Sequence, residues 1–595
     1  MCGIIGVATK KLAISDIIEG LSRLEYRGYD SSGIAIIEGE KISRYREVGK
    51  LRELQLVIQN KMLYGGCGIG HTRWATHGKP DRENAHPHCD SNLNFAVVHN
   101  GIIENYVDLS KELRDKGIEL QSQTDTEVIP HMLGEELKNK KITKMNVVKA
   151  INEVTKKLRG SYALCVVVRG LECVFCIKLG SPLVIGKSNK GMYVASDSVA
   201  LSNVSSIAYL NDNEICVLES DKIVMYDEKL VRKNIQYKSV DITQSEVDKG
   251  NYQHFMQKEI DECNISLVKT LENLEAQDNK KLQQVLNVDE LHITACGTAL
   301  NAGKVLGNIL KSKLGINAIM ECASEYRYNV LCGNKNSVGL VISQSGETAD
   351  TIGCVELMKA KGISLIGVTN VSTSQIARMV DVNLSTMAGK ELAVASTKAY
   401  VAQLGVMYYL LSEIAKIKGI EYVVDLEKIK SIAINNNTNY YEVWEDVIEE
   451  LAKSSDMYVL GRGLDYVVAE EVALKIKEIS YIHCEAMPMG ELKHGSLALI
   501  TEKTKVIVIL TQQDLVDKVI SNIREIMARG GQVILITNQQ VEIEVWKKVI
   551  IDNVEDIFSP LVSIRPMQQL AYMLAIKRGN DPDKPRNLAK SVTVE

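Results

Sequence analysis

The second residue of this chain is a cysteine, and an apolar run, residues 3–8, follows it directly. If an aminopeptidase removes Met1, Cys2 carries a thiol beside a free α-amine. An α-amine titrates at about 7.7–8.0, so at cellular pH part of it is neutral and can take the thiol proton. The pair is therefore a candidate nucleophile with its own base. Taken alone, Cys2 is more readily explained as an unreactive cysteine, because buried cysteines are common.

Three polar segments of the first 130 residues could serve such a nucleophile. Residues 71–78 gather imidazoles, a hydroxyl and the Arg73 guanidinium, which together suit a clamp for a carboxylate. Asn100 ends a strand-like run beside Gly101, and a side-chain amide next to an unshielded backbone N–H could form an oxyanion hole. Asp125 stands at a predicted helix start, where it could bind an ammonium group. A helix cap is the simpler explanation of Asp125 by itself.

A hydroxyl-rich loop occupies the second half of the chain. The strand-like run 339–342 leads into residues 343–348, Ser-Gln-Ser-Gly-Glu-Thr, and then into a helix. Hydroxyls together with the N–H groups of a helix N-terminus can hold a phosphate. An ordinary helix cap requires fewer hydroxyls than this loop provides. Residues 511–514, at the corresponding point of a later repeat, lack the pattern, so we expect one phosphate site.

A second group of polar residues follows near residue 480. Lys475 and Glu478 lie three residues apart on a helix predicted over residues 467–480, where such a pair is ordinarily a surface ion pair. The glycine-bounded polar loop 490–495 comes next and contains His494. Aldose–ketose isomerisation needs a base to move a proton between adjacent carbons and an acid to open the sugar ring. Carboxylates and imidazoles can fill both roles.

The elements that must position these groups differ between the two halves of the chain. Up to about residue 240, short strand-like runs alternate with a few amphipathic helices, which favours stacked antiparallel sheets covered by helices. From about residue 288, strands alternate with long helices, as in doubly wound parallel sheets. This second half contains an internal repeat, because the pattern that begins at Leu291 recurs from Met457. The expected strands of the first half are 33–37, 67–73, 95–98, 161–168, 183–186, 192–197 and 223–227, and its expected helices are 13–24, 105–116, 127–138 and 146–158.

Length and composition restrict the class of protein. A chain of 595 residues suggests three or four domains. The net charge of −5, without a dense Lys/Arg tract, argues against nucleic acid and acidic membranes as partners. No apolar run approaches the roughly 20 residues of a membrane span, and the N-terminus does not resemble a signal peptide, so we expect a soluble, cytoplasmic protein. The 13 cysteines are scattered, and Cys173 and Cys176 stand within one strand-like run, so we expect no disulfide and no metal.

Taken together, the polar segments of the first 240 residues resemble the glutaminase domain of the class II amidotransferases. The resemblance rests on residues 2–6, 26–31, 71–78, 84–88, 100–101 and 124–125. It implies the N-terminal nucleophile hydrolase fold, an αββα sandwich, in which Cys2 attacks the side-chain amide of glutamine. The implied roles of the other residues are an oxyanion hole for Asn100 and Gly101, carboxylate binding for Arg73, Thr76 and His77, ammonium binding for Asp125 and gating of ammonia release for Trp74.

The second half resembles the paired sugar isomerase (SIS) domains of amidotransferases that convert fructose 6-phosphate into glucosamine 6-phosphate. This resemblance rests on residues 296–298, 343–348, 394–398, 477–483 and the tail 585–595, so the two resemblances cover nearly the whole chain. They imply that Glu478 is the isomerisation base, that Lys475 supports it and that His494 opens the ring in a neighbouring subunit's site. Lys590 would hold the open-chain ketone as a Schiff base. The implied sugar-phosphate ligands are Cys296, Gly297, Thr298, Ser343, Gln344, Ser345, Thr348, Val394, Ala395, Ser396, Ala589 and Lys590.

The expected fold is thus an αββα N-terminal nucleophile hydrolase sandwich followed by two doubly wound parallel-sheet SIS domains. The expected boundaries are a glutaminase domain at 2–240, a linker with a helical lead-in at 241–285, SIS domains at 286–425 and 453–585, and a tail at 586–595 that joins the sugar site. The implied function is hydrolysis of glutamine and transfer of its ammonia to fructose 6-phosphate with isomerisation, the first step of amino-sugar synthesis. We expect no metal and no organic cofactor, and the resemblance implies a homodimer.

Two alternatives differ from this interpretation. A glutaminase joined to a phosphoribosyltransferase should carry a strand that ends in an acidic pair before its phosphate loop, whereas residues 343–346 are Ser-Gln-Ser-Gly. A sugar-phosphate sensor would keep the isomerase fold without turnover, but such a sensor has no need of Glu478, Lys590 or the Cys2 group.

Overall fold

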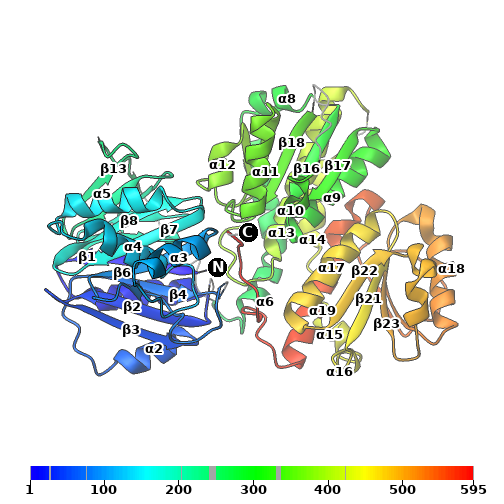
Figure 1. Ribbon diagram of the computed structural model, residues 1–595. Helices are drawn as coiled ribbons and strands as arrows, with labels where there is room; N and C mark the ends of the chain where they lie inside the picture. Colours follow the sequence, from blue (N-terminus) through cyan, green and yellow to red (C-terminus); the bar gives the residue numbers. More distant parts are fainter. Residues whose placement is uncertain are drawn as a thin grey trace. The chain divides into compact units, whose positions relative to one another are not determined.

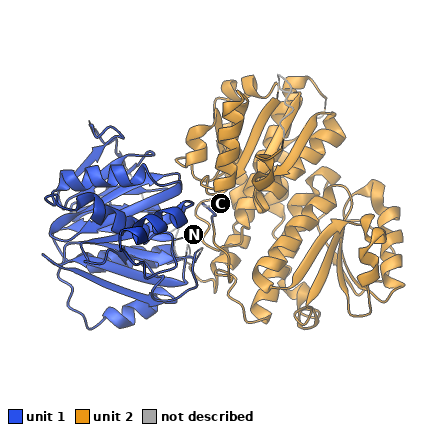
Figure 2. Ribbon diagram, in the orientation of Figure 1, with its two compact units in different colours: residues 1–243, 591–595 blue, residues 244–590 orange. Residues whose placement is uncertain are grey.

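The computed structural model describes residues 2–25, 28–75, 77–202, 204–239, 249–287, 289–329, 337–421 and 424–593. The chain divides into two compact units, which Figure 2 colours separately. Unit 1 comprises Met1–Thr243 with Ser591–Glu595, and unit 2 comprises Gln244–Lys590. Each unit has its own sheets and its own apolar core.

Unit 1 is built on two antiparallel sheets of eight and seven strands (Figure 1). The first sheet has the order β15-β11-β9-β10-β1-β4-β2-β3, and the second has the order β14-β13-β12-β8-β7-β6-β5. The strands of the first sheet are β1 Gly3–Thr9, β2 Ser31–Ile37, β3 Ile42–Val48, β4 Cys67–Arg73, β9 Val184–Lys187, β10 Gly191–Ala195, β11 Ser206–Tyr209 and β15 Lys238–Ser239. Those of the second are β5 His88–Cys89, β6 Phe95–Ile103, β7 Gly160–Val168, β8 Leu171–Leu179, β12 Ile215–Leu218, β13 Ile223–Tyr226 and β14 Arg232–Lys233.

Three apolar layers hold unit 1 together, and they make it the predicted αββα sandwich. Inner faces of the two sheets meet through small and branched side chains such as Ile4, Ala35 and Val98. Both faces of each sheet are apolar, so the outer face of each sheet must also be covered. A layer of helices packs on each outer face. These helices are α1 Ala13–Leu24 and α2 Leu51–Ile58 on the first sheet, and α3 Tyr106–Asp115, α4 Val128–Leu137 and α5 Lys144–Thr155 on the second.

Unit 2 contains two parallel five-stranded sheets with one topology. The two sheets have the same strand order, which confirms the predicted repeat. These orders are β17-β16-β18-β19-β20 and β22-β21-β23-β24-β25. The first sheet consists of β16 Glu290–Ala295, β17 Asn317–Cys322, β18 Ser337–Ser343, β19 Ser364–Thr369 and β20 Val382–Ser385. The second consists of β21 Asp456–Gly461, β22 His483–Pro488, β23 Lys505–Leu510, β24 Gln532–Thr537 and β25 Lys547–Ile550.

One continuous apolar core joins the two repeats of unit 2. At its centre lies α13, Lys398–Lys418, a 21-residue helix that is buried along most of its length and ends at Gly419 in the left-handed region. The other helices are α6 Phe255–Asp261, α7 Cys263–Glu275, α8 Lys280–Val285, α9 Thr298–Ile309, α10 Ala323–Tyr326, α11 Ala349–Ala360, α12 Gln375–Met379, α14 Leu426–Asn435, α15 Tyr441–Trp444, α16 Ile448–Leu451, α17 Leu464–Ser480, α18 Val516–Met527 and α19 Ser559–Lys577. Among the described residues, no helix is both long and apolar enough to cross a membrane.

Two helices of unit 2 begin earlier than their apolar periodicity indicates. α17 begins at Leu464, three residues before the predicted helix 467–480, and α9 begins at Thr298. Each helix follows a glycine with positive φ, Gly297 at 55° and Gly463 at 57°, which turns the chain sharply out of the preceding strand. Apolar periodicity does not report such a turn, so the first helical residues were missed. One of them, Thr298, belongs to the candidate sugar site.

Gly461, the last residue of β21, offers a test of how tightly α17 packs on its strand. A Cβ added there would lie 2.4 Å from the backbone carbon of Asp465, which cannot move without shifting the helix. We expect Gly461→Ala to destabilise unit 2 by about 1–3 kcal/mol, as overpacking does. Gly495 is the matched control, because its φ of 167° is extended and nothing lies within 4 Å of an added Cβ. Equal melting temperatures for the two variants would contradict this packing.

Candidate active sites

Cys2 lies at the start of β1, in the middle of the first sheet of unit 1. The register of β1 with β4 pairs Gly3 with Thr72, so Cys2 reaches the end of β4. The Trp74 backbone N–H donates to the Cys2 Sγ at 3.2 Å. Burial raises the pKa of the Cys2 thiol, while the Arg73 guanidinium lowers it to a smaller extent. A thiol with a raised pKa is mostly protonated at neutral pH, so the nucleophile needs a base beside it.

The second sheet brings Asn100 and Gly101 to Cys2. Both residues lie in β6, which continues past the predicted end at residue 98. The Asn100 side-chain amide donates to the Cys2 carbonyl at 2.9 Å, and its Oδ1 lies 3.1 Å from the His71 Nε2. Gly101 has a φ of 133°, and a Cβ there would lie 2.0 Å from the Ser161 carbonyl oxygen. Only glycine fits this position, which leaves its backbone N–H unshielded by a side chain.

Arg73 and Asp125 are both buried, and both act on the pKa of Cys2. The Arg73 guanidinium donates to the carbonyls of His77, of Gly78 at 3.2 Å and of Lys79 at 3.4 Å, so a short turn encircles it. Asp125 accepts a hydrogen bond from the Ile103 N–H at 2.7 Å. A cation and a carboxylate near one nucleophile can hold the two ends of an amino acid. Thr76, which was predicted to bind the same carboxylate, lies outside the described residues.

Four buried histidines pack together in unit 1, close to Asn100. The rings of His71 and His86 stack with centroids 4.1 Å apart, and His86 meets His88 edge to face at 4.7 Å. The backbone N–H of His99 donates to the His86 Nδ1 at 3.3 Å, which adds His99 to the cluster. Burial lowers the pKa of each of these histidines, in His71 to about 3. These four histidines are therefore neutral at physiological pH.

The candidate phosphate loop of unit 2 follows β18 at the point where the strand order of the sheet reverses. Such switch points are the usual ligand sites of open parallel sheets. β16 and β18 are neighbours, with Ala295 opposite Ile342, so residues 296–298 and 343–348 meet at one edge. The Ser343 Oγ accepts from the Gly346 N–H at 3.0 Å and lies 2.8 Å from the Thr348 Oγ1. These bonds curl the loop so that its hydroxyls gather ahead of α11.

Lys590 reaches this region of unit 2 through Glu391, a residue that the sequence analysis did not select. The Lys590 ammonium donates to the Glu391 carboxylate and, at 3.3 Å, to the Ser396 Oγ. Glu391 also accepts from the N–H groups of Thr397 at 2.9 Å and Ala399 at 3.0 Å. Although burial opposes the ionised carboxylate, the Lys590 ammonium lowers the pKa of Glu391 to about 2. The buried ion pair thus ties Lys590 to the segment that carries Val394, Ala395 and Ser396.

Lys475 and Glu478 form an ion pair, but not the surface pair that their spacing suggests. Lys475 is 1% exposed and lies 2.5 Å from the Glu478 carboxylate, and its second partner is Glu471 at 3.6 Å. Glu471 in turn accepts from Thr298 at 3.1 Å and from Asn301 at 2.9 Å, both in the first repeat. Burial raises the pKa of Glu471 to about 7. A carboxyl group with that pKa can accept or release a proton at neutral pH.

Glu471 is therefore a second residue that sequence reasoning missed. A signal was present, because Glu471 lies four residues before Lys475 on the same helical face, within the apolar run of α17. His494 behaves differently: it is exposed in a short 3₁₀ turn, Glu491–His494. Among the described residues, no hydrogen bond or ion pair joins it to Lys475 or Glu478.

Two family models match this chain. One describes a glutamine amidotransferase domain and matches residues 71–203. The other describes a SIS domain and matches twice, at residues 285–413 and 450–578. Both SIS matches fall on the repeated parallel sheets of unit 2, and the amidotransferase match falls on the sandwich of unit 1.

Relatives match the chain over its full length. The chain is 41% identical to the glutamine–fructose-6-phosphate aminotransferase (isomerizing) of Clostridium acetobutylicum, with all of both chains covered. It is also 41% identical to the enzyme of that name from Clostridium perfringens, again over the whole of both chains. Among solved structures, the C-terminal domain of glucosamine-fructose-6-phosphate aminotransferase from Francisella tularensis matches 56% of this chain and 99% of its own at 33% identity, with a TM-score of 0.53.

The histidine cluster predicts a loss of stability in acid. A histidine whose folded pKa is depressed binds protons more readily when unfolded, so stability is complete above pH 6.5 and falls as the pH drops. Each such histidine contributes about 1.4 kcal/mol per pH unit between its two pKa values. We expect His86→Phe to reduce the dependence by that amount, while exposed His483→Gln in unit 2 leaves it unchanged. Urea unfolding at pH 5.5 and 7.5, followed by a labelling pulse of buried Cys165 at pH 8, measures the free energy of unfolding of unit 1. The prediction is contradicted if this free energy changes equally with pH in the wild type and in His86→Phe.

Proposed function

This chain belongs to the glutamine–fructose-6-phosphate aminotransferase (isomerizing) family, and on that premise we propose that it makes glucosamine 6-phosphate and glutamate from fructose 6-phosphate and glutamine. The observation that carries the proposal is the presence of two separate chemical groups in one chain. In unit 1, the Cys2 carbonyl accepts a hydrogen bond from Asn100, a candidate residue of the oxyanion hole. In unit 2, a hydroxyl loop stands at the switch point of the first SIS sheet, and buried lysine–carboxylate pairs occur elsewhere in the same unit.

In unit 1, we propose that Cys2 attacks the side-chain amide carbon of glutamine once Met1 has been removed. The freed α-amine takes the thiol proton and returns it to the leaving nitrogen, so that ammonia departs and a thioester remains. Water then hydrolyses the thioester to give glutamate. The Asn100 amide and the Gly101 N–H stabilise the tetrahedral oxyanion. Arg73, Thr76 and His77 bind the carboxylate of glutamine, Asp125 binds its ammonium, and Trp74 gates ammonia release.

In unit 2, we propose that the hydroxyls of Ser343, Ser345 and Thr348, with Gln344, hold the phosphate of fructose 6-phosphate. The remaining sugar contacts are Cys296, Gly297, Thr298, Val394, Ala395, Ser396 and Ala589. Support for a single phosphate site comes from the second repeat, where Asp465 accepts from the Thr511 N–H at 2.8 Å. A carboxylate at that position excludes an anion by charge and by volume.

The acid and base groups of unit 2 then carry out the transfer. His494 opens the ring, Lys590 holds the C2 ketone as a Schiff base, and ammonia displaces the lysine to leave an imine at C2. Glu478 removes a proton from C1 and one is returned to C2, which converts the ketose imine into the aldose amine. Lys475 is held between Glu478 and Glu471. Although burial disfavours its charge, these two carboxylates raise the pKa of Lys475, so it remains a cation beside the base.

We further propose that the enzyme acts in the cytoplasm as a homodimer, with no metal or organic cofactor. The exposed position of His494 supports the dimer, since the resemblance places this residue in the site of a neighbouring subunit. Acid and base groups of the chain itself can carry out every step above. A closed two-fold dimer would exchange two His494 residues between two equivalent sites.

Incubation of the full chain with glutamine and fructose 6-phosphate tests this function. We expect glucosamine 6-phosphate and glutamate in equal amounts from protein whose measured mass lacks Met1. Cys2→Ala should abolish the use of glutamine, whereas fructose 6-phosphate should still isomerise to glucose 6-phosphate. Absence of glucosamine 6-phosphate with Met1-processed protein would overturn the function. Equal loss of isomerisation in Cys2→Ala would instead contradict the separation of the two sites.

A second experiment tests the ion pair between Glu391 and Lys590. Glu391→Gln leaves the Lys590 ammonium without its charged partner, so we expect at least a tenfold lower kcat for glucosamine 6-phosphate formation. Reduction with borohydride in the presence of fructose 6-phosphate should trap less Schiff base on Lys590, and Glu391→Asp should restore part of it. Glutamine hydrolysis serves as the internal reference, and exposed Glu421→Gln is the matched control. Unchanged trapping in Glu391→Gln would remove Glu391 from this role.

A further inference from the structure

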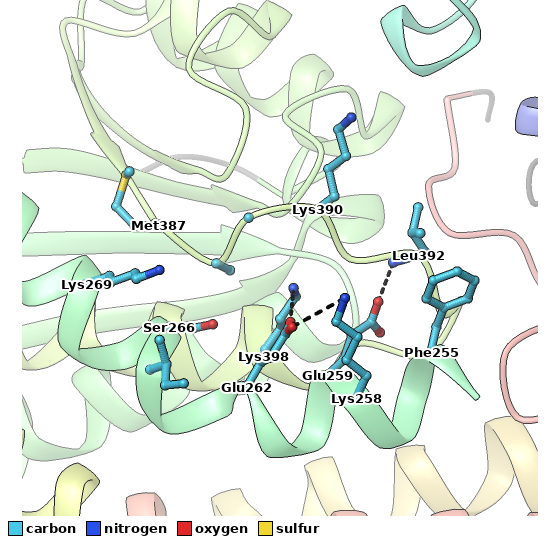
Figure 3. Close-up of a pocket in the computed structure, with 13 residues that line it drawn as sticks. Phe255, Lys258, Glu259, Glu262, Ser266, Lys269, Met387, Lys390, Leu392 and Lys398 are labelled. Atoms are coloured by element: carbon cyan, nitrogen blue, oxygen red, sulfur yellow. Dashed lines mark hydrogen bonds and ion pairs between the residues drawn. The ribbon is translucent and has the colours of Figure 1, made fainter. Parts of the chain in front are cut away.

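A pocket of about 280 Å³ lies in unit 2, between α6 and α7 on one side and the segment 387–392 on the other (Figure 3). Its charged lining is dominated by lysines, with Lys258, Lys269, Lys390 and Lys398 set against Glu259 and Glu262. None of these residues is a candidate for binding glutamine or fructose 6-phosphate. The volume is close to the lower end of small-molecule sites, about 300 Å³.

The pocket carries an excess of positive charge. Lys258 and Lys398 share one carboxylate, Glu262, at 3.8 Å and 2.7 Å (Figure 3). Lys269 has no acidic partner among the described residues of the chain. Glu259 does not compensate for it, because burial and then the nearby Glu391 raise the pKa of Glu259 to about 8. Its Oε1 accepts from the Leu392 N–H instead. At neutral pH, the four lysines that line the pocket thus outnumber its single ionised carboxylate.

Ser266 adds a polar group that has no partner of its own. Its side chain is 4% exposed and lines the pocket, and within the described part of the chain no hydrogen bond is found for its hydroxyl. Ser266 and Lys269 are three residues apart on α7, and Figure 3 draws both on the same side of the pocket. A hydroxyl that lines a pocket and has no partner in the protein is free to donate to a ligand or to water. Beside Lys269 and Lys398, the group that satisfies it best is an anion with several oxygen atoms.

We propose that this pocket binds a small phosphate-bearing dianion, in a site separate from the loop Ser343–Thr348. The Ser266 hydroxyl and the ammonium groups of Lys269 and Lys398 would donate to three phosphate oxygens, with Lys258 adding charge. The site goes beyond the proposed function, because neither glutamine nor fructose 6-phosphate requires it. Its wall includes Leu392, the residue after Glu391, so a bound anion lies next to the segment that holds Lys590.

Binding of inorganic phosphate to the full chain tests the proposal, measured by equilibrium dialysis at low ionic strength. Ser343→Ala/Ser345→Ala/Thr348→Ala removes the loop site, so that variant should still bind one phosphate per chain. Adding Ser266→Ala/Lys269→Gln should weaken the remaining site at least tenfold. Adding Lys361→Gln instead, which removes an exposed lysine of unit 2, should change the affinity less than twofold.

Two results would overturn the site. One is no phosphate binding to the triple variant at 10 millimolar phosphate, on the order of the weakest useful affinity for a metabolite. The other is equal affinity with and without Ser266→Ala/Lys269→Gln. An unchanged circular dichroism spectrum and melting temperature of the full chain confirm that unit 2 is folded in each variant. A failure of the proposed function would appear in the glucosamine 6-phosphate assay and would leave these dialysis results unaffected.

Discussion

The buried carboxylate of Glu391 is the constraint on which the sugar site of unit 2 depends. A buried charge is strongly unfavourable unless it is paired and fully hydrogen-bonded. Glu391 meets that requirement with the Lys590 ammonium, the Ser396 hydroxyl and two backbone N–H groups at the start of α13. Because Lys590 is 199 positions from Glu391, the segment around Lys590 must fold onto that of Glu391 before the pair can form. Neighbouring Glu259 responds in the opposite way and stays protonated, since two adjacent buried carboxylates do not both ionise readily.

The two units solve the problem of buried polar groups differently. In unit 1, the Cys2 thiol has a raised pKa and the four clustered histidines have lowered ones, so these groups are neutral. A protonated thiol depends on a base, which the freed α-amine can supply. In unit 2, several buried groups are instead charged and paired, as Lys475 is with Glu478. Paired charges suit a site that must stabilise ionic intermediates of a sugar.

The sequence predicted much of the fold because periodic patterns are local. The helix at residues 13–24 and the strand at 67–73 have the predicted bounds, and both αββα layering and the repeated parallel sheets follow from such patterns. Residues 296–298 and 343–348, which the resemblance assigned to one sugar-phosphate site, follow two neighbouring parallel strands. The partners of buried charges were not predictable in this way. Glu391 and Lys590 are 199 positions apart, and Glu471 contacts Asn301 from the other repeat, so only the tertiary fold brings them together.

The two repeats of unit 2 differ in the groups that lie at the candidate switch point of each sheet. Two residues after Gly463, Asp465 accepts hydrogen bonds from both the N–H and the hydroxyl of Thr511. Burial raises the pKa of Asp465 to about 6, so its charge is tolerated there because Thr511 satisfies it. The equivalent residue of the first repeat, two after Gly297, is Ala299, which has no side-chain acceptor. In the second repeat, the Asp465 carboxylate therefore accepts the hydrogen bonds of Thr511 at the end of the strand. In the first repeat, Ala299 offers no carboxylate at the equivalent position, so an external anion could take that place at the switch point.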